Sequence, residues 1–215
     1  RLLQQASGCR LGADIELHKR LPLGGGVGGG SSDAATTLVA LNRLWGTGLD
    51  RDALATLGLQ LGADVPVFVR GQSAWAEGVG ERLQPVSLPP TWYLVLVPEC
   101  HVATASVFQA PELTRDSKPI TMPDFFAGRA RNDCQAVVAA RHAEVAAALR
   151  QLGAAGRMSG TGACVFAPFA SAAAAQAAWP RGWRGFVARG VDRSPLLDRL
   201  EAAADGAAAP GGPPR

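Results

Sequence analysis

The fold of this chain is decided by one glycine-rich segment, Leu21-Pro22-Leu23-Gly24-Gly25-Gly26-Val27-Gly28-Gly29-Gly30-Ser31-Ser32-Asp33-Ala34-Ala35. Its glycines let the backbone approach a ligand closely, because no Cβ atom stands in the way. Ser31 and Ser32 follow directly, and small hydroxyl residues favour the first turn of a helix, where free N–H groups and the helix dipole attract anions. The segment therefore predicts a cradle for phosphate groups.

Three other interpretations of the glycines were weighed. A Walker A loop is excluded, because no lysine follows the glycines. A dinucleotide-binding fingerprint matches formally at Gly24, Gly26 and Gly29, but Pro22 and the polar strand before it do not suit a buried parallel strand. A purely structural flexible loop is the third alternative, and the two hydroxyl residues at the start of a helix argue against it.

Composition sets the broader limits. With 215 residues, of which 47% are hydrophobic and 18% charged, the chain can fold as one large domain or two small ones. The formal net charge is +3, and the arginines are scattered, so no nucleic-acid-binding stripe is expected. No apolar run reaches the roughly 18 residues of a membrane span. Cys9, Cys100, Cys134 and Cys164 form no CxxC pair, which favours reduced thiols in a cytoplasmic protein over disulfides or a zinc site.

Hydrophobic periodicity predicts the order of the elements. A helix of residues 1–6, a strand of residues 13–21, helices of residues 34–45 and 50–61, and a hairpin of residues 67–69 and 74–83 are expected in the first part. The second part is expected to hold a strand of residues 92–97, a long helix of residues 133–152, a strand of residues 163–167, a helix of residues 170–179 and a strand of residues 185–191. Residues 201–215 are rich in Ala, Gly and Pro and are expected to form a disordered tail.

The glycine-rich segment resembles the phosphate-binding motif of the GHMP kinases, the superfamily of galactokinase, homoserine, mevalonate and phosphomevalonate kinases. Further motifs follow in the order of that family: residues 61–68, Ala76-Glu77-Gly78-Val79-Gly80-Glu81, Asn132-Asp133, and residues 158–166. Together they resemble the branch that phosphorylates the C2 hydroxyl of a cytidine-diphosphate-linked alcohol in isoprenoid biosynthesis. The likeness covers about residues 1–200.

The resemblance implies roles for individual residues. Asp64 would be the catalytic base that takes the proton of the attacking hydroxyl, although an Asp before a proline is by itself an ordinary turn residue. ATP would be bound by residues of the strand end, the glycine-rich loop and the helix start: Lys19, Pro22, Leu23, Gly24, Gly25, Gly26, Val27, Gly28, Gly29, Gly30, Ser31, Ser32 and Asp33. ATP implies Mg²⁺, for which Ser32 is the one candidate ligand.

The same resemblance implies the substrate pocket. Phe108 would stack on the cytosine, with Thr104 and Val79 nearby, although a Phe is more often a core residue. Gly160, Thr161 and Gly162 would form a second glycine-rich turn that closes on the phosphates. The partner is thus a small molecule linked to cytidine diphosphate, with no nucleic acid and no membrane, and the sequence does not define an oligomeric state.

Some family features are missing from these residues. The family has a Pro-Ala-Lys-x-Asn segment, whose lysine pairs with the aspartate, and an Asp-Gly-Tyr-His segment, and neither occurs here. Residue 1 is Arg and no helix-capping residue precedes the first helix, so the chain is expected to lack its N-terminal segment and to be inactive as given. Asp33 stands where Asn is usual, and Ala105 where Pro is common.

We therefore expect an α+β protein with the two-domain GHMP kinase fold. Residues 1–80 would be the remainder of an N-terminal domain similar to ribosomal S5 domain 2, and residues 81–200 a ferredoxin-like C-terminal domain. The expected function is ATP-dependent phosphorylation of the cytidine-linked alcohol. A non-catalytic nucleotide-binding fragment and a GHMP kinase with another small alcohol as substrate are the alternatives.

Overall fold

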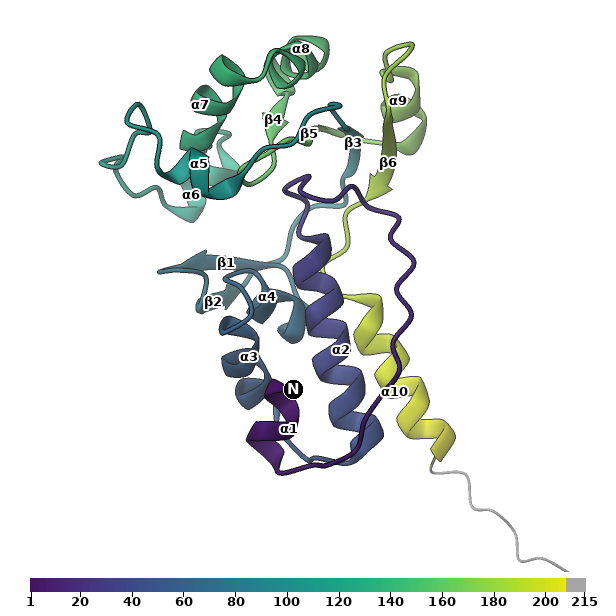
Figure 1. Ribbon diagram of the computed structural model, residues 1–215. Coiled ribbons are helices and arrows are strands. Elements are labelled where there is room, and N and C mark those ends of the chain that lie inside the picture. Colours follow the sequence, from purple (N-terminus) through teal and green to yellow (C-terminus); the bar gives the residue numbers. More distant parts are fainter. Residues whose placement is uncertain (208–215) are drawn as a thin grey trace, which may run out of the picture. The chain divides into compact units, whose positions relative to one another are not determined.

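The computed structural model describes residues 1–207, which form two compact units (Figure 1). Unit 1 comprises residues 1–16, 30–88 and 191 onward, and unit 2 comprises residues 17–29 and 89–190. The chain thus crosses between the units four times, whereas the sequence analysis divided it once, near residue 80. The predicted domain boundaries stay predictions, and each unit is described by itself below.

Unit 1 is built mainly of helices: α1 (Leu2–Ser7), α2 (Gly29–Trp45), α3 (Arg51–Leu59), α4 (Val65–Arg70) and α10 (Pro195–Ala207). The helix expected at the start of the chain is present as α1. Figure 1 shows α3 and α10 beside the long helix α2. Their apolar faces share one core, in which Leu38, Leu54 and Val69 are buried and Leu200 of α10 packs against them. This core fixes the start of α2, which carries the predicted hydroxyl residues.

Helix α3 begins where the sequence predicts. Asp50 is its N-cap, and its carboxylate accepts a hydrogen bond from the backbone N–H of Ala53 at 2.8 Å.

Two short segments of unit 1 differ from the prediction. Residues 67–69 were expected to form a strand, but they lie in α4, because Pro66 suits a first helical turn and Gly71 ends the helix with φ 68°. The hairpin instead consists of β1 (Ala74–Glu77) and β2 (Arg82–Pro85), which pair antiparallel. The predicted pairing of residues 67–69 with residues 74–83 was therefore wrong, because residues 74–83 themselves hold β1, the turn and the start of β2.

Residues 13–21, expected as a strand, carry no regular structure. The side chains of Ile15 and Leu17 are exposed. A strand needs a neighbour to accept its backbone hydrogen bonds, and among residues 1–207 no segment pairs with this one. The alternating pattern alone therefore did not produce a strand.

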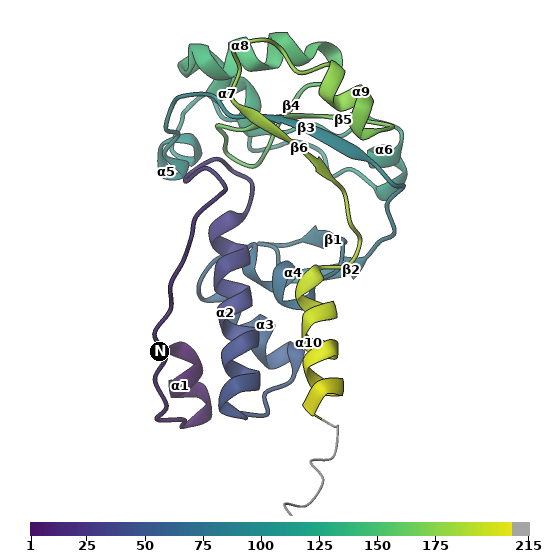
Figure 2. The same cartoon turned by 90° about the vertical axis from the view of Figure 1, so that its right-hand side faces the viewer.

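Unit 2 is a sheet covered by helices. The antiparallel order is β4-β5-β3-β6, formed by β4 (Arg157–Met158), β5 (Val165–Phe169), β3 (Trp92–Leu96) and β6 (Gly185–Arg189). Figure 2 shows α7 (Asp133–Arg141), α8 (Ala143–Leu152) and α9 (Ala172–Ala177) on one face of this sheet. Leu94 and Val165 from the strands are buried with Val138 and Val145 from the helices. The 3-10 turn η1 (Gly153–Ala155) and the helices α5 (Thr104–Phe108) and α6 (Met122–Phe126) complete the unit.

Two helix predictions need correction. The single helix expected over residues 133–152 is interrupted at His142, whose extended backbone (φ −128°, ψ 101°) separates α7 from α8. Residues 201–207, expected as part of a disordered tail, are the end of α10, because Leu196, Leu197 and Leu200 bury one side of that helix in unit 1. The rest of the predicted tail, residues 208–215, lies outside the described residues.

All four thiols are free in the structure, and Cys164 is buried. No helix within residues 1–207 is long and apolar enough to span a membrane.

Candidate active site

The glycine-rich loop of unit 2 is held by a second glycine-rich turn. The carbonyl of Gly25 accepts a hydrogen bond from the backbone N–H of Cys164 at 3.0 Å. The hydroxyl of Ser159 donates to the carbonyl of Gly26 at 2.8 Å. A Cβ atom placed on Gly26, where φ is +72°, would stand 2.2 Å from the carbonyl oxygen of Ser159. Only glycine fits there. These contacts show that the structure brings the loop and the predicted Gly160–Gly162 turn together.

Other predicted residues line this loop. Pro22 lies under Gly25, since a Cβ on that glycine would be 2.9 Å from the Pro22 Cγ. Lys19 lies beside Gly29, where a Cβ would be 3.6 Å from its Nζ. Burial, and to a smaller extent Cys100, raises the pKa of Cys164 to about 11. The thiol beneath the loop is therefore neutral and places no negative charge against a bound phosphate.

The second turn is tied to the neighbouring elements by side chains. The hydroxyls of Thr104 and Thr161 are hydrogen-bonded at 2.9 Å. The amide of Asn132 donates to the carbonyls of Met158, at 3.0 Å, and of Gly160, at 2.7 Å. Thr104 and Thr161, both predicted site residues, are thus brought together. Asn132 and Ser159 were not among the predicted site residues.

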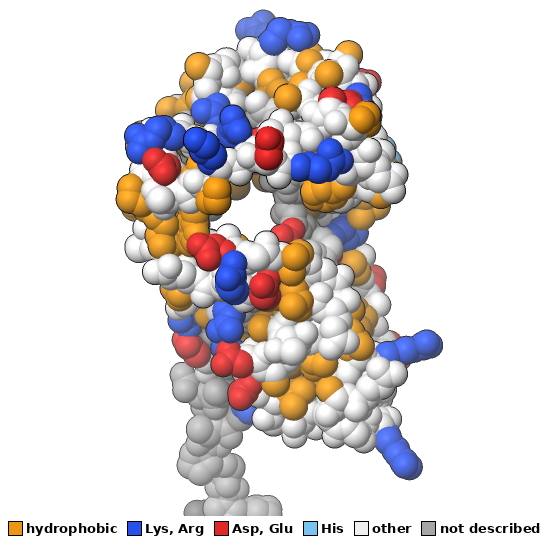
Figure 3. Space-filling view, turned by 90° about the vertical axis from the view of Figure 1, so that its left-hand side faces the viewer, with side chains coloured by type: hydrophobic (Ala, Val, Ile, Leu, Met, Phe, Trp, Pro, Cys, Tyr) orange, Lys and Arg blue, Asp and Glu red, His pale blue; other side chains and the backbone are white. Residues whose placement is uncertain are grey.

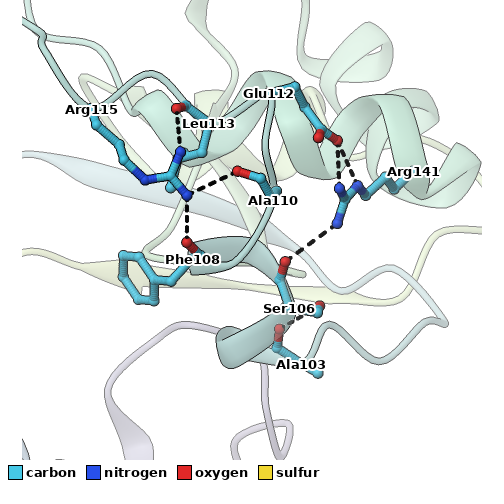
Figure 4. Close-up of polar contacts among 8 residues, drawn as sticks. All are labelled: Ala103, Ser106, Phe108, Ala110, Glu112, Leu113, Arg115 and Arg141. Carbon is cyan, nitrogen blue, oxygen red and sulfur yellow. Dashed lines mark hydrogen bonds and ion pairs between the residues drawn. The ribbon is translucent and has the colours of Figure 1, made fainter.

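Phe108 stands at the end of α5 with 57% of its side chain exposed. Figure 4 shows how Arg115 holds this end of the helix. Its guanidinium donates to the carbonyls of Phe108 at 2.7 Å, of Ala110 at 2.9 Å and of Leu113 at 3.0 Å. Because the sequence around Arg115 carries no motif, this support could not be found from the sequence.

A second arginine supports the same helix. Arg141 donates to the carbonyl of Ser106 at 3.3 Å and to the carboxylate of Glu112 at 2.7 Å (Figure 4). The backbone of α5 is therefore fixed by two side chains from outside it, while the ring of Phe108 is open to solvent.

Basic side chains gather on the face of unit 2 shown in Figure 3, over the segment that connects α5, α6 and α7. Lys118, Arg129 and Arg131 line a groove of about 430 Å³ there. Arg129 is paired with Asp124 at 2.7 Å and Arg131 with Asp133 at 3.1 Å. Asp116 lines the same groove, so acidic side chains offset much of the positive charge on this face.

Unit 1 carries the other predicted residues. Ser31, Ser32 and Asp33 are half-buried in the first turns of α2, a helix of 17 residues. A Cβ placed on Gly62 would lie 3.9 Å from the Ser31 hydroxyl, and one on Gly80 would lie 2.6 Å from the carbonyl oxygen of Ala63. The start of α2, the turn before Asp64 and the hairpin turn with Val79 are therefore neighbours in this unit.

Asp64 is exposed and precedes α4 as its N-cap residue. An Asp at this position ordinarily accepts a hydrogen bond from the helix, as Asp50 does from Ala53. The carboxylate of Asp64 makes no such bond, and no other hydrogen bond or ion pair to a described residue engages it. Its oxygens are free to accept a proton or a hydrogen bond from a ligand.

Val79 is the last predicted site residue of unit 1. Its side chain is 69% exposed in the turn between β1 and β2. Its backbone N–H donates to the Glu81 carboxylate at 2.7 Å. Hydrogen bonds from the N–H of Glu81 itself and from that of Val79 lower the pKa of Glu81. The turn is thereby closed by an ionised side chain, and the Val79 side chain points to no partner in the core.

Comparison with protein families gives two matches. Residues 1–72 match the model described as the GHMP kinases N terminal domain, and residues 126–185 match GHMP kinases C terminal.

Individual proteins are similar over nearly the whole chain. The 4-diphosphocytidyl-2-C-methyl-D-erythritol kinase of Alkalilimnicola ehrlichii is 61% identical over 96% of this chain and 73% of its own length. The enzyme of the same name from Halorhodospira halophila is 60% identical over 96% of this chain and 75% of its own length. A crystal structure of 4-(cytidine 5'-diphospho)-2C-methyl-D-erythritol kinase superposes with a TM-score of 0.70 at 34% identity, covering 88% of this chain and 74% of that one. Homoserine kinase from Cytophaga hutchinsonii, at 20% identity and a TM-score of 0.55, shares the fold.

Proposed function

The chain belongs to the 4-diphosphocytidyl-2-C-methyl-D-erythritol kinases of the GHMP kinase family, and we propose that it contributes to transfer of the γ-phosphate of ATP to the C2 hydroxyl of that cytidine-linked alcohol. The expected α+β two-domain GHMP kinase fold is confirmed by the same comparisons. The residue roles that follow are proposals, argued from the geometry of each unit.

Asp64 is the proposed catalytic base. The observation that supports this role is the unengaged, exposed carboxylate at the start of α4, in contrast to the capping carboxylate of Asp50. In the proposed step a carboxylate oxygen of Asp64 accepts the hydroxyl proton, the hydroxyl oxygen bonds to the γ-phosphorus, and the bond from that phosphorus to the bridging oxygen breaks to release ADP. Positioning the hydroxyl is the larger part of this task, because phosphoryl transfer needs little covalent help.

The backbone of Gly24–Ser32 is the proposed binding site of the ATP phosphates. GHMP kinases use ATP as phosphate donor. Gly26 is fixed against Ser159. The first turn of α2 holds Ser31 and Ser32 and no acidic side chain, so its N–H groups can face an anion without competition.

Mg²⁺ is the proposed metal of the reaction. The hydroxyl of Ser32 is an oxygen donor of the kind that this ion prefers, and it lies in the first turn of α2. When bound, Mg²⁺ would neutralise phosphate charge. Asp33 and Lys19 are proposed to face the nucleoside part of ATP.

Phe108 is the proposed stacking partner of the cytosine. An exposed aromatic ring on a backbone held by two arginines offers a flat apolar face at low entropic cost, and a base stacks on such a face. Thr104 and Thr161, which are hydrogen-bonded to each other, and Val79 are proposed as further contacts to the substrate. Gly160 and Gly162 are proposed to approach the substrate through their backbone.

Two alternatives to this function stay open. Another GHMP substrate, such as homoserine or mevalonate, is favoured only by the shared fold. A non-catalytic nucleotide-binding role would use the glycine-rich loop and leave Asp64 idle. We propose a cytoplasmic location, with neither a nucleic acid nor a membrane as partner.

Turnover of a substrate panel tests the proposal. The product of the complete gene is assayed with ATP and, in turn, the cytidine-linked alcohol, homoserine and mevalonate, and the phosphate ester is located by ³¹P NMR. We expect phosphorylation of the cytidine-linked alcohol at C2 only. Phosphorylation of another alcohol would assign the substrate differently, and ATP binding without any product would favour the non-catalytic role.

A further inference from the structure

Three side chains of unit 2 bring sulfur, nitrogen and oxygen donors together outside the residues discussed above. The Sγ of Cys100, a ring nitrogen of His142 and a carboxylate oxygen of Glu144 all lie within 4.8 Å of one another. Cys100 follows β3, His142 stands between α7 and α8, and Glu144 is in the first turn of α8. None of the three has a role in the proposed phosphoryl transfer.

The backbone that carries these donors is already fixed. His142 donates its N–H to the carbonyl of Val138 at 2.8 Å, and its carbonyl accepts from the N–H groups of Val145 and Ala146, each at 3.1 Å. Cys100 packs against the hydrophobic core of unit 2. The backbone at two of the donors, Cys100 and His142, is therefore already ordered before an ion binds. This lowers the entropic cost of binding.

The donor atoms are also unused. Within the described part of the chain, no hydrogen bond or ion pair engages the thiol, the imidazole ring or the Glu144 carboxylate. Glu112, an exposed carboxylate of the same unit, is by contrast bonded to Arg141 at 2.7 Å. Separations of up to 4.8 Å exceed those in a tetrahedral zinc site by roughly 1 Å, given bond lengths of about 2.0 to 2.3 Å. Glu144 is exposed, so its side chain can rotate toward the other two donors when an ion binds.

We propose that Cys100, His142 and Glu144 bind a divalent transition-metal ion of the Zn²⁺ type, with water as the fourth ligand. A thiolate, an imidazole and a carboxylate are the three ligand classes that Zn²⁺ accepts. The thiol proton passes to solvent when the ion binds, and the resulting thiolate and carboxylate balance the ion's charge. Mg²⁺ takes an octahedral set of oxygen ligands, so this site is chemically distinct from the proposed Mg²⁺ of phosphoryl transfer.

The bound ion would connect the segment after β3 to the junction of α7 and α8. His101 follows Cys100, and its ring lies against the glycine-rich loop, since a Cβ placed on Gly24 would be 3.1 Å from the His101 Nδ1. A cavity of about 390 Å³ beside the loop is lined by both residues and by Cys164. Binding of the ion is therefore expected to raise the thermal stability of unit 2, which holds the glycine-rich loop.

Co²⁺ is the probe that tests this site, because its spectrum reports both a thiolate ligand and tetrahedral geometry. We expect metal-free protein titrated with Co²⁺ to develop a thiolate-to-cobalt charge-transfer band with a stoichiometry of about one ion per chain. Zn²⁺ should displace Co²⁺, and excess Mg²⁺ should not. Circular dichroism establishes that each variant below is folded.

The ligand variants decide the assignment. Cys100→Ser should abolish the charge-transfer band, and His142→Ala and Glu144→Gln should each weaken Co²⁺ binding at least about tenfold. Cys134→Ser is the matched control, because Cys134 is also a half-buried thiol of unit 2, and it should leave the band unchanged. The proposal is overturned if the protein shows no thiolate band, or if the band survives Cys100→Ser. If Cys100→Ser does not fold, unchanged affinity in the exposed Glu144→Gln variant overturns the three-ligand site.

Discussion

The glycine-rich loop (residues 24–29) and the helix α5, both in unit 2, are held in place by different means. The loop is fixed by two hydrogen bonds, from the Ser159 hydroxyl and from the backbone N–H of Cys164, and by a close approach that excludes any side chain on Gly26. Helix α5 has only five residues, and it is fixed by long side chains, those of Arg115 and Arg141, which reach its carbonyls. A single methyl group should therefore disrupt the loop, whereas α5 should respond in smaller steps as its supports are removed.

The largest of these effects is expected for Gly26→Ala. The new Cβ would meet the Ser159 carbonyl oxygen at 2.2 Å, and the positive φ of this residue adds about 1 to 2 kcal/mol of strain. The loop must move, so ATP affinity, measured by isothermal titration calorimetry, should fall at least about a hundredfold.

Gly128→Ala is the control for that variant. Gly128 has the same positive φ of +72°, but a Cβ there meets no atom within 4 Å. We expect the Gly128→Ala variant to be less stable than the unchanged protein but to keep its ATP affinity. Equal losses of ATP affinity in both variants would show that backbone strain, and not the close approach to Ser159, causes the loss.

A smaller effect is expected for Phe108→Ala. Loss of one stacked base costs about 1 to 3 kcal/mol, so KM for the cytidine-linked substrate should rise about tenfold to a hundredfold with KM for ATP unchanged. Phe125→Ala removes another exposed ring of the same unit and should leave both constants as they are. A rise in the ATP constant with Phe108→Ala would place that ring at the nucleotide donor instead.

The smallest effect is expected for Arg115→Met, which keeps the aliphatic stem and removes three hydrogen bonds, two of them exposed. Since such bonds contribute about 0.5 to 1.5 kcal/mol each and most of these are open to water, KM for the cytidine-linked substrate should rise about three- to fivefold. Arg115→Lys should recover part of the loss. A lower kcat with unchanged KM would contradict a role in placing Phe108.

These two regions also show what the sequence could and could not predict. The glycines carry their own signal, because a missing Cβ is visible in the sequence, and the loop does pack where only glycine fits. Arg115 carries no such signal, and the motifs that contain Asn132 and Ser159 do not show what these side chains bind, because that depends on which carbonyls lie within reach after folding. The strand predicted for residues 13–21 was wrong for another reason. The alternation was clear, but a strand depends on a partner that the pattern does not specify.

The break at His142 belongs to the same class of error. The alanine-rich sequence on both sides favours a helix, and no local residue pattern predicts an extended residue between α7 and α8.

The residue roles of the candidate site stay predictions.

The steady-state kinetics of Asp64→Asn test the central proposal most directly, with both substrates varied in the product of the complete gene. The amide keeps the size of the side chain and removes the base, so kcat should fall by about 10² or more while the affinity for ATP stays nearly unchanged. The free carboxylate at the start of α4 predicts this separation of chemistry from binding. Unchanged kcat with a raised KM for ATP would contradict it, and would make Asp64 a structural turn residue.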